Sequence, residues 1–269
     1  MSPPVLDGLR LAVTTFTVLP LRPGRVDRAT ARLAMAWTPL VGAGLGLVVA
    51  AGLFGSRIIF ADEPGPLLPA AIAVALLALL TRGLHLDGLA DTVDGLASHL
   101  PADRALRIMR SPEIGPIGLV AVVLVLLLQV NALTVCVANH RSTESVLLAV
   151  LAGRLTVLWS CLRGTPAARP DGLGALVAGT TRRPLAVLWT IAVAVEAWVY
   201  GRLDRDAGTV RGGLRAVGAL LLALGIVWVL RRHVVRRLGG ITGDVLGAQV
   251  EIAQASVLIL MAVQFAATR

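Results

Sequence analysis

GPIGLVAVVLVLLLQVNALTVCV, which runs from Gly115 to Val137, contains no charged side chain. A helix needs about 20 mostly apolar residues to cross a hydrocarbon core of about 30 Å, so this stretch is long enough to span a membrane. The composition of the chain agrees, because 56% of its 269 residues are hydrophobic and only 15% are charged. Soluble proteins carry about 25% charged residues. The sequence therefore predicts an all-α fold, a polytopic helix bundle in a membrane.

Similar apolar stretches recur along the chain, and they predict about seven transmembrane helices. The predicted spans are Leu33–Phe54, Pro66–Arg82, Gly115–Val137, Ser145–Arg163, Pro184–Tyr200, Leu214–Leu230 and Val245–Ala266. The segment Val5–Leu19 is interrupted by Asp7 and Arg10, so we expect an interfacial helix there and no secretory signal. No repeat of fixed period divides the sequence, and residues 1–269 are expected to form one integral membrane domain.

The distribution of arginine predicts the orientation of the helices. All 25 basic residues other than histidine are Arg, and most lie before the first span or after the second, fourth and sixth. Basic residues accumulate on the cytoplasmic side of membrane proteins, so we predict N-in, C-out in the cytoplasmic membrane. The net charge of +9 is then explained by arginines in the segments predicted on the cytoplasmic side of the membrane. It does not indicate a nucleic-acid partner.

An acidic motif, HLDGLADTVDG from His85 to Gly95, follows the second apolar stretch. If this segment is helical, Asp87, Asp91 and Asp94 lie within an arc of about 60° on one face. Three carboxylates at a membrane edge are costly to desolvate unless a cation neutralises them. Oxygen ligands suit Mg²⁺ or Mn²⁺. The motif therefore predicts a cytoplasmic metal site that faces phosphate. The plainer alternative is a solvated helix end whose acids favour the helix dipole.

A second acidic element begins the last predicted span. Asp244 and Glu251 are seven residues apart and share a helical face, and Gly243 leaves backbone amides free for phosphate oxygens. A flexible turn followed by one acid explains Asp244 alone. It does not explain Glu251, which lies about two turns inside the membrane, where an ionised group needs a cavity or a partner.

Arg154 is a permanent cation near the middle of the fourth span. Two interpretations stay open at this point. Arg154 pairs with Glu251 or another intramembrane acid, or it holds a substrate phosphate through two parallel hydrogen bonds.

These motifs strongly resemble those of the cobalamin synthase family, the adenosylcobinamide-GDP ribazoletransferases. The resemblance covers most of the chain. Its motifs occur in the family's order and are Leu19-Pro20, Pro39–Gly42, His85–Gly95, Ile108–Arg110, Gly115 with Gly118, Arg154, Leu238–Gly240 and Thr242–Glu251. The first acidic motif is long and specific, whereas the others are individually weak.

The resemblance implies a Mg²⁺-dependent transfer that completes the nucleotide loop of vitamin B12. A ribose hydroxyl of α-ribazole, or of α-ribazole 5′-phosphate, would attack the phosphorus bonded to cobinamide in adenosylcobinamide-GDP and expel GMP. Because the corrinoid is large, its pocket is expected to open to the lipid bilayer or to a second subunit of a homodimer.

Roles for individual residues follow from the same resemblance. Asp87, Asp91, Asp94, Asp244 and Glu251 would bind metal; Asp94, Asp244 and Arg154 would act in catalysis; Arg110, Gly243 and His85 would bind substrate. Asp94 or Asp244 would accept the proton of the attacking hydroxyl. The chain departs from the family after Arg110, where Ser111 replaces an expected acid. Either Glu113 compensates, or that acid is not a ligand.

Two other classes fit less well. The run Asp91–Gly95 matches the start of the acidic signature of CDP-alcohol phosphotransferases, but the Ala-Arg pair expected after it is absent and Ala248 replaces a fourth Asp. A cation transporter could use Glu196, Glu251 and Arg154. Transporters usually place such ligands near the midplane between matching halves, whereas most acids here cluster at one face and no repeat appears.

Overall fold

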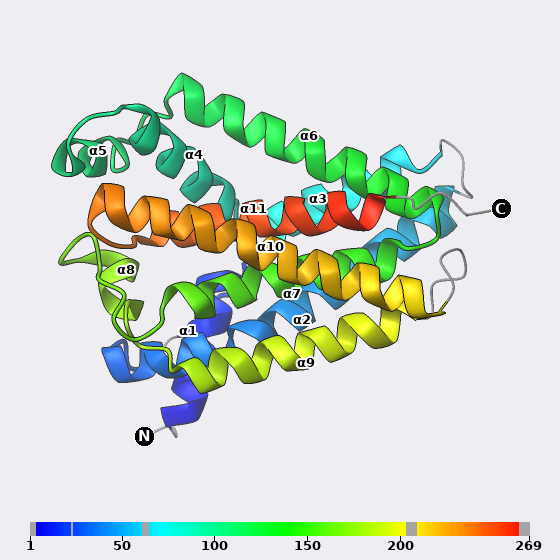
Figure 1. Ribbon diagram of the computed structural model, residues 1–269, viewed down its shortest axis with the longest axis horizontal. Coiled ribbons are helices and arrows are strands. Elements are labelled where there is room, and N and C mark those ends of the chain that lie inside the picture. The colour runs from blue at the N-terminus through cyan, green and yellow to red at the C-terminus, as the bar shows by residue number, and fades with distance from the viewer. Residues whose placement is uncertain (1–3, 23, 61–64, 203–208, 264–269) are drawn as a thin grey trace.

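The computed structural model describes residues 4–22, 24–60, 65–202 and 209–263, and within these ranges the chain is helical, with two isolated β-bridges. The helices are α1 (Pro4–Phe16), α2 (Arg28–Phe60), α3 (Leu67–Leu80), α4 (Leu84–Ala97), α5 (Ala102–Ile108), α6 (Pro116–Ala138), α7 (Ser142–Ser160), α8 (Gly172–Val177), α9 (Arg183–Gly201), α10 (Thr209–Leu238) and α11 (Gly243–Ala262). The long helices run side by side, and the short α4, α5 and α8 gather at one end of the bundle (Figure 1). The predicted all-α fold is confirmed.

Six described helices are long and apolar enough to cross a membrane, namely α2, α6, α7, α9, α10 and α11. Each overlaps one predicted span, although α10 continues to Leu238, well past the predicted end at Leu230. The predicted end of the last span, Ala266, lies outside the described residues. The chain is thus a multi-pass membrane protein. The predicted N-terminal helix is present as α1, which packs along α2.

The second predicted span, Pro66–Arg82, coincides with α3, but α3 is not long enough to count as a crossing by itself. Helix α3 is only 14 residues long and meets α4 at an angle of 86°. The bend lies at Arg82 and Gly83, whose positive φ angles of 56° and 66° a right-handed helix cannot accommodate. At about 1.5 Å per residue, α3 is too short to cross a bilayer alone. If the bent pair counts as one span, the number of candidate spans rises to seven.

Helix α7 forms the centre of the bundle. Its residues from Ser145 to Leu158 are buried throughout, against α2 on one side and α11 on another. Helix α6 has the opposite character, since its apolar residues from Leu119 to Leu128 are largely exposed. An exposed apolar helix face is expected where a protein contacts lipid. The arrangement places α7 and α11 inside the protein and α6 at its lipid-facing edge.

The first and last described helices end at opposite sides of the bundle. Helix α1 lies near the end that holds α5 and α8, whereas α11 runs from that end toward the far one (Figure 1). Seven crossings, with the bent pair counted as one, would give this arrangement. The N-in, C-out orientation itself stays a prediction.

Candidate active site

A cavity of about 280 Å³ lies at the end of the bundle where α4, α5 and α8 gather. Five residues predicted from the sequence line it: His85, Asp87, Arg110, Gly243 and Asp244. Arg169, Asp171 and residues of α8 complete the wall. The two sequence motifs that begin at His85 and Thr242 therefore meet in space.

Glycines bring the two acidic helices together. A Cβ atom on Gly88 would lie 2.6 Å from the backbone oxygen of Asp244, and one on Gly247 would lie 3.1 Å from the Cα of His85. Atoms this close would overlap, so only glycine permits the crossing of α4 and α11. The crossing places the carboxylates of α4 beside the first turn of α11.

We expect Gly88→Ala to lower both the stability and the activity of the protein. The neighbouring atoms belong to the backbone of Asp244 and cannot rotate away, so α4 and α11 must separate, at a cost of about 1–3 kcal/mol. The measurement is the thermal unfolding midpoint in detergent together with turnover. Gly44→Ala in α2 is the matched control, because nothing lies within 4 Å of its Cβ position. Equal behaviour of the two variants would contradict the close crossing.

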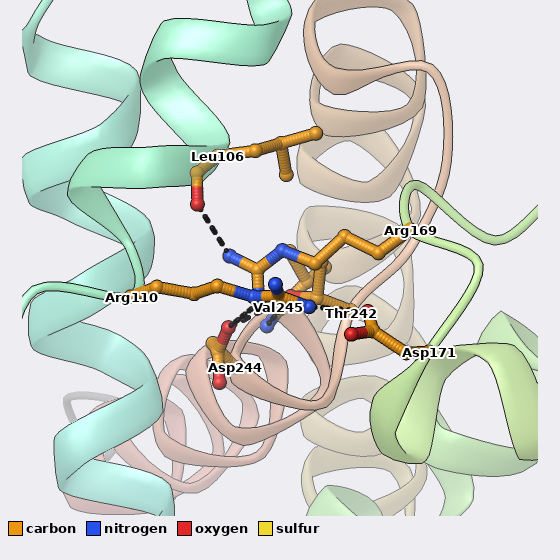
Figure 2. A network of polar contacts seen from close by, with 7 residues as sticks. All are labelled: Leu106, Arg110, Arg169, Asp171, Thr242, Asp244 and Val245. Carbon is orange, nitrogen blue, oxygen red and sulfur yellow. Dashed lines mark hydrogen bonds and ion pairs between the residues drawn. The ribbon is translucent and has the colours of Figure 1, made fainter.

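Asp244 occupies the first turn of α11, where Thr242 caps the helix. The Thr242 hydroxyl accepts a hydrogen bond from the backbone N–H of Val245 at 3.2 Å and donates one to Asp244 at 3.2 Å. Arg169 forms an ion pair with Asp244 at 3.3 Å and donates to the carbonyl oxygen of Leu106 at 2.8 Å. Arg169 thereby joins the start of α11 to α5 (Figure 2).

A second ion pair crosses the same cavity. Arg110, which follows α5, pairs with Asp171, which precedes α8. Figure 2 shows Arg110 and Arg169 reaching from opposite sides toward each other and toward the two aspartates. The acid that Arg110 contacts is therefore in the loop before α8. Glu113 is exposed and does not line the cavity.

The three aspartates of α4 lie on one helix, as predicted, but their surroundings differ. Asp87 is exposed and Asp91 is half-buried, and among the described residues neither has a hydrogen-bond or ion-pair partner. Asp91 lies within electrostatic reach of Asp87, Asp94 and Asp244, with Arg169 as a compensating cation. Negative charge is therefore concentrated where α4 and α11 cross.

Asp94 contacts the start of α6. Its two carboxylate oxygens accept hydrogen bonds from the backbone N–H groups of Gly115 and Gly118, each at 2.8 Å. A carboxylate at this position satisfies amides that have no partner within the helix and favours the helix dipole. Asp94 does not line the cavity. Its observed contacts fix α6 against α4.

Arg154 and Glu251 lie away from the cavity, in a buried polar network between α6, α7 and α11. The Arg154 side chain is fully buried and donates to the side-chain oxygen of Gln254 at 3.3 Å. Glu251 accepts hydrogen bonds from Gln129 at 2.8 Å and from Gln254 at 3.3 Å. The Nε and Nη2 atoms of Arg154 are buried and have no hydrogen-bond partner among the described residues. The pairing of Arg154 with an acid and its contact with a substrate phosphate both stay predictions.

His85 lies at the inner wall of the cavity. It is buried, and its ring stacks on Phe16 of α1 with centroids 6.2 Å apart. Its Nε2 atom is buried and has no hydrogen-bond partner among the described residues. The position agrees with a substrate-facing role for His85.

Comparison with known proteins now adds to this geometry. The model of the cobalamin-5-phosphate synthase family matches residues 8–262. The chain belongs to this family. It is 48% identical to the adenosylcobinamide-GDP ribazoletransferase of Frankia casuarinae, over 94% of this chain and 93% of that relative. Enzymes of the same name from a Nocardioides species and from Pseudomonas entomophila are 43% and 38% identical, over 98% and 97% of their lengths. No solved structure matches the chain.

Two charged residues that line the cavity were not predicted as site residues from the sequence. Arg169 and Asp171 flank Pro170 in the loop between α7 and α8, and no motif marks them. The predicted topology did place this loop and Asp87 on the same side of the membrane, which is compatible with their meeting in one cavity. An isolated β-bridge between Ala167 and Ile241 then holds Arg169 beside Asp244.

The family resemblance implies that the protein binds Mg²⁺, and the carboxylates near the cavity are suitable ligands for this ion. Asp87, Asp91 and Asp244 offer carboxylate oxygens, the ligands that Mg²⁺ prefers, and two of them lack a partner among the described residues. Within the described ranges, no three His, Cys, Asp or Glu side chains are grouped so that they could hold an ion. Holding one would therefore require these carboxylates to move together.

Proposed function

We propose that this chain is an adenosylcobinamide-GDP ribazoletransferase that acts at the cytoplasmic membrane. A cavity with both acidic and basic walls carries the proposal, because Asp87 and Asp244 face it together with Arg110 and Arg169. A diphosphate with its counter-ion needs groups of both signs. Family membership supplies the substrates, adenosylcobinamide-GDP and α-ribazole or its 5′-phosphate.

The arginines would bind the diphosphate by exchanging partners. Arg110 now pairs with Asp171 and Arg169 with Asp244, and both guanidinium groups border the cavity. Phosphate oxygens match the planar guanidinium fork at least as well as a carboxylate does. The first amides of α11, at Gly243 and Asp244, lie at a helix N-terminus and favour the same anion.

Asp87, Asp91 and Asp244 would hold the metal. Bound Mg²⁺ would neutralise the diphosphate and stabilise the charge that develops on the departing GMP. Asp94 and Glu251, also predicted as ligands, have other partners, the amides of α6 and the glutamine network. Within this proposal they position α6 and α11.

The transfer makes one bond and breaks one. The acceptor hydroxyl oxygen bonds to the phosphorus attached to cobinamide, the bond from that phosphorus to the GMP oxygen breaks, and the hydroxyl proton passes to a carboxylate. Asp94 and Asp244 were the predicted acceptors of that proton. The structure favours Asp244, because Asp244 borders the cavity and Asp94 does not. Asp244 must be free of Arg169 to take the proton.

The proposed orientation is N-in, C-out, with the cavity open to the cytoplasm. It is supported by the arginines of α5, of the start of α9 and of the last turns of α10, which lie at the same end of the bundle as the cavity (Figure 1): Arg104, Arg107, Arg182, Arg183, Arg236 and Arg237. Their accumulation at one end of the bundle agrees with the positive-inside rule.

The proposed reaction predicts GMP release by the purified protein. We expect GMP and a cobalamin product only when adenosylcobinamide-GDP, an α-ribazole acceptor and Mg²⁺ are all present. Chromatography of the reaction mixture measures both products. Supplying α-ribazole or its 5′-phosphate separately identifies the preferred acceptor. If no GMP forms with either acceptor at any concentration of Mg²⁺ or Mn²⁺, the proposed function is wrong.

A further inference from the structure

A second and larger cavity, of about 740 Å³, lies between α7, α9 and α10. It occupies a different face of α7 from the candidate active site. Val157 lines the first cavity, whereas Thr156 and Ser160, which are one turn apart, line the second. The two cavities share none of their lining residues. The proposed reaction leaves the larger one without a role.

The shape of this cavity follows from the packing of α9 and α10. The helices touch closely at one end, where a Cβ on Gly201 would lie 2.5 Å from the backbone oxygen of Gly212 and one on Gly213 would lie 2.6 Å from the ring of Trp198. From there they diverge toward the end that holds α8 (Figure 1). The cavity is lined by Arg183 and Thr190 of α9 and by residues of α10 between Leu221 and Arg231. It is a wedge between two membrane-spanning helices.

The wide end of the wedge is cationic. Arg163, Arg183 and Arg231 line it, and none of them forms an ion pair with a carboxylate among the described residues. A β-bridge between Leu162 and Thr181 brings the loop of Arg163 beside the start of α9. Arg231 donates to the Thr165 hydroxyl, and its Nε atom is buried without a partner. Arg163 and Arg183 are exposed and Arg231 is half-buried, so the three guanidinium groups are accessible to an anionic ligand.

The rest of the wedge is apolar and open to the side. Leu221, Leu224 and Val227 line it, and Trp228 lies one turn from Arg231. Leu221 is 54% exposed and Trp228 is 51% exposed on helices that cross the membrane, so this rim faces lipid. A small phosphorylated solute would use the arginines and leave the apolar part empty. An amphiphile with an anionic head fits both parts.

We propose that the wedge binds one anionic phospholipid, with its phosphate among Arg163, Arg183 and Arg231 and one acyl chain between α9 and α10. Basic pockets between transmembrane helices, at the cytoplasmic side, bind anionic headgroups in this way. The site is independent of the transferase reaction. Its ligand is a component of the bilayer.

Native mass spectrometry of delipidated protein in detergent tests the charge of the ligand. We expect one tightly bound phosphatidylglycerol and at least about tenfold weaker binding of phosphatidylcholine with the same acyl chains. Replacing two arginines, Arg183→Gln with Arg231→Gln, should weaken phosphatidylglycerol binding by about 30-fold. The matched control, Arg182→Gln with Arg236→Gln, removes two exposed arginines outside the wedge and should leave binding within about twofold.

A second pair of variants tests the apolar part without changing charge. A Cβ at Gly225 or at Gly218 of α10 would meet nothing within 4 Å, so both positions accept a larger side chain. Only Gly225 lines the wedge. Gly225→Leu should reduce phosphatidylglycerol binding by about tenfold, and Gly218→Leu should not.

Three results would overturn the proposal. The first is equal binding of phosphatidylglycerol and phosphatidylcholine. The second is unchanged phosphatidylglycerol binding in both the double arginine variant and Gly225→Leu. The third is displacement of the lipid by inorganic phosphate or glycerol 3-phosphate alone. The last result would assign the arginines to a soluble phosphate compound. Because the assay requires no turnover, failure of the lipid site is distinguishable from failure of the proposed reaction.

Discussion

Asp244→Asn is expected to lower the turnover number for GMP release by about 10³-fold, a loss typical of removing one group that stabilises transition-state charge. The variant loses the negative charge that would hold the metal or take the proton. Its amide oxygen can still accept hydrogen bonds from Thr242 and Arg169, so the first turn of α11 should keep its structure. Single-turnover release of GMP is the measurement.

Asp103→Asn is the matched control for this experiment. Asp103 is an exposed acid in the short helix α5, and it does not line the cavity. Its replacement should leave turnover within about twofold of the unmodified protein, as expected for a surface substitution. Both variants should unfold at the temperature of the parent protein. An Asp244→Asn protein that retains more than about a tenth of native turnover would exclude Asp244 from the chemistry.

Arg154→Met is expected to destabilise the protein by about 3–5 kcal/mol, because it leaves the buried Glu251 without a nearby cation and Gln254 without a donor. For a chain of this length, the thermal unfolding midpoint should fall by roughly 10 °C. Protein that remains folded should keep its KM for adenosylcobinamide-GDP, because Arg154 does not line the cavity. Thermal unfolding in detergent and steady-state kinetics measure the two effects.

The partner of Arg154 is tested by a second substitution. Combining Arg154→Met with Glu251→Gln removes both charges at similar volume and should recover part of the lost stability. Arg182→Gln, at an exposed arginine, serves as a control and should change stability by less than about 0.5 kcal/mol. If Arg154→Met keeps the parent unfolding midpoint but binds the donor more weakly, Arg154 holds a phosphate instead.

The helical acidic face could be predicted from the sequence because its geometry is local. Asp87, Asp91 and Asp94 are four and three residues apart, and a helix places such positions on one side. The different environments of the three acids could not be predicted in this way. Asp94 meets the amides of Gly115 and Gly118 only because α6 folds back along α4.

The bend between α3 and α4 escaped prediction because it depends on Arg82. A non-glycine residue rarely adopts a positive φ angle, so the residue type at position 82 does not indicate a bend there. Arg82 donates a hydrogen bond to the carbonyl oxygen of Thr14 in α1. That contact joins residues far apart in the sequence. Tertiary structure therefore stabilises a conformation that local preference disfavours.

The cavity also depends on contacts between distant segments. Arg169 and Asp244 are brought together by the bridge between Ala167 and Ile241, and no pattern in either segment indicates the other. By contrast, the position of Glu251 was informative by itself, because an acid inside a membrane requires a partner. The sequence could not identify Gln129 and Gln254 as the residues that satisfy it.

The two ion pairs of the cavity have a consequence for its response to ionic strength. A pocket that holds only arginines attracts phosphate strongly in dilute buffer and loses that attraction as salt is added. Here Arg110 and Arg169 already have carboxylate partners. When a diphosphate binds with its cation, the arginines exchange carboxylate partners for phosphate, and the carboxylates exchange arginine for the cation. The number of charges without an ionic partner therefore changes little. Affinity for the donor should accordingly depend less on salt concentration than the basic charge of the chain suggests.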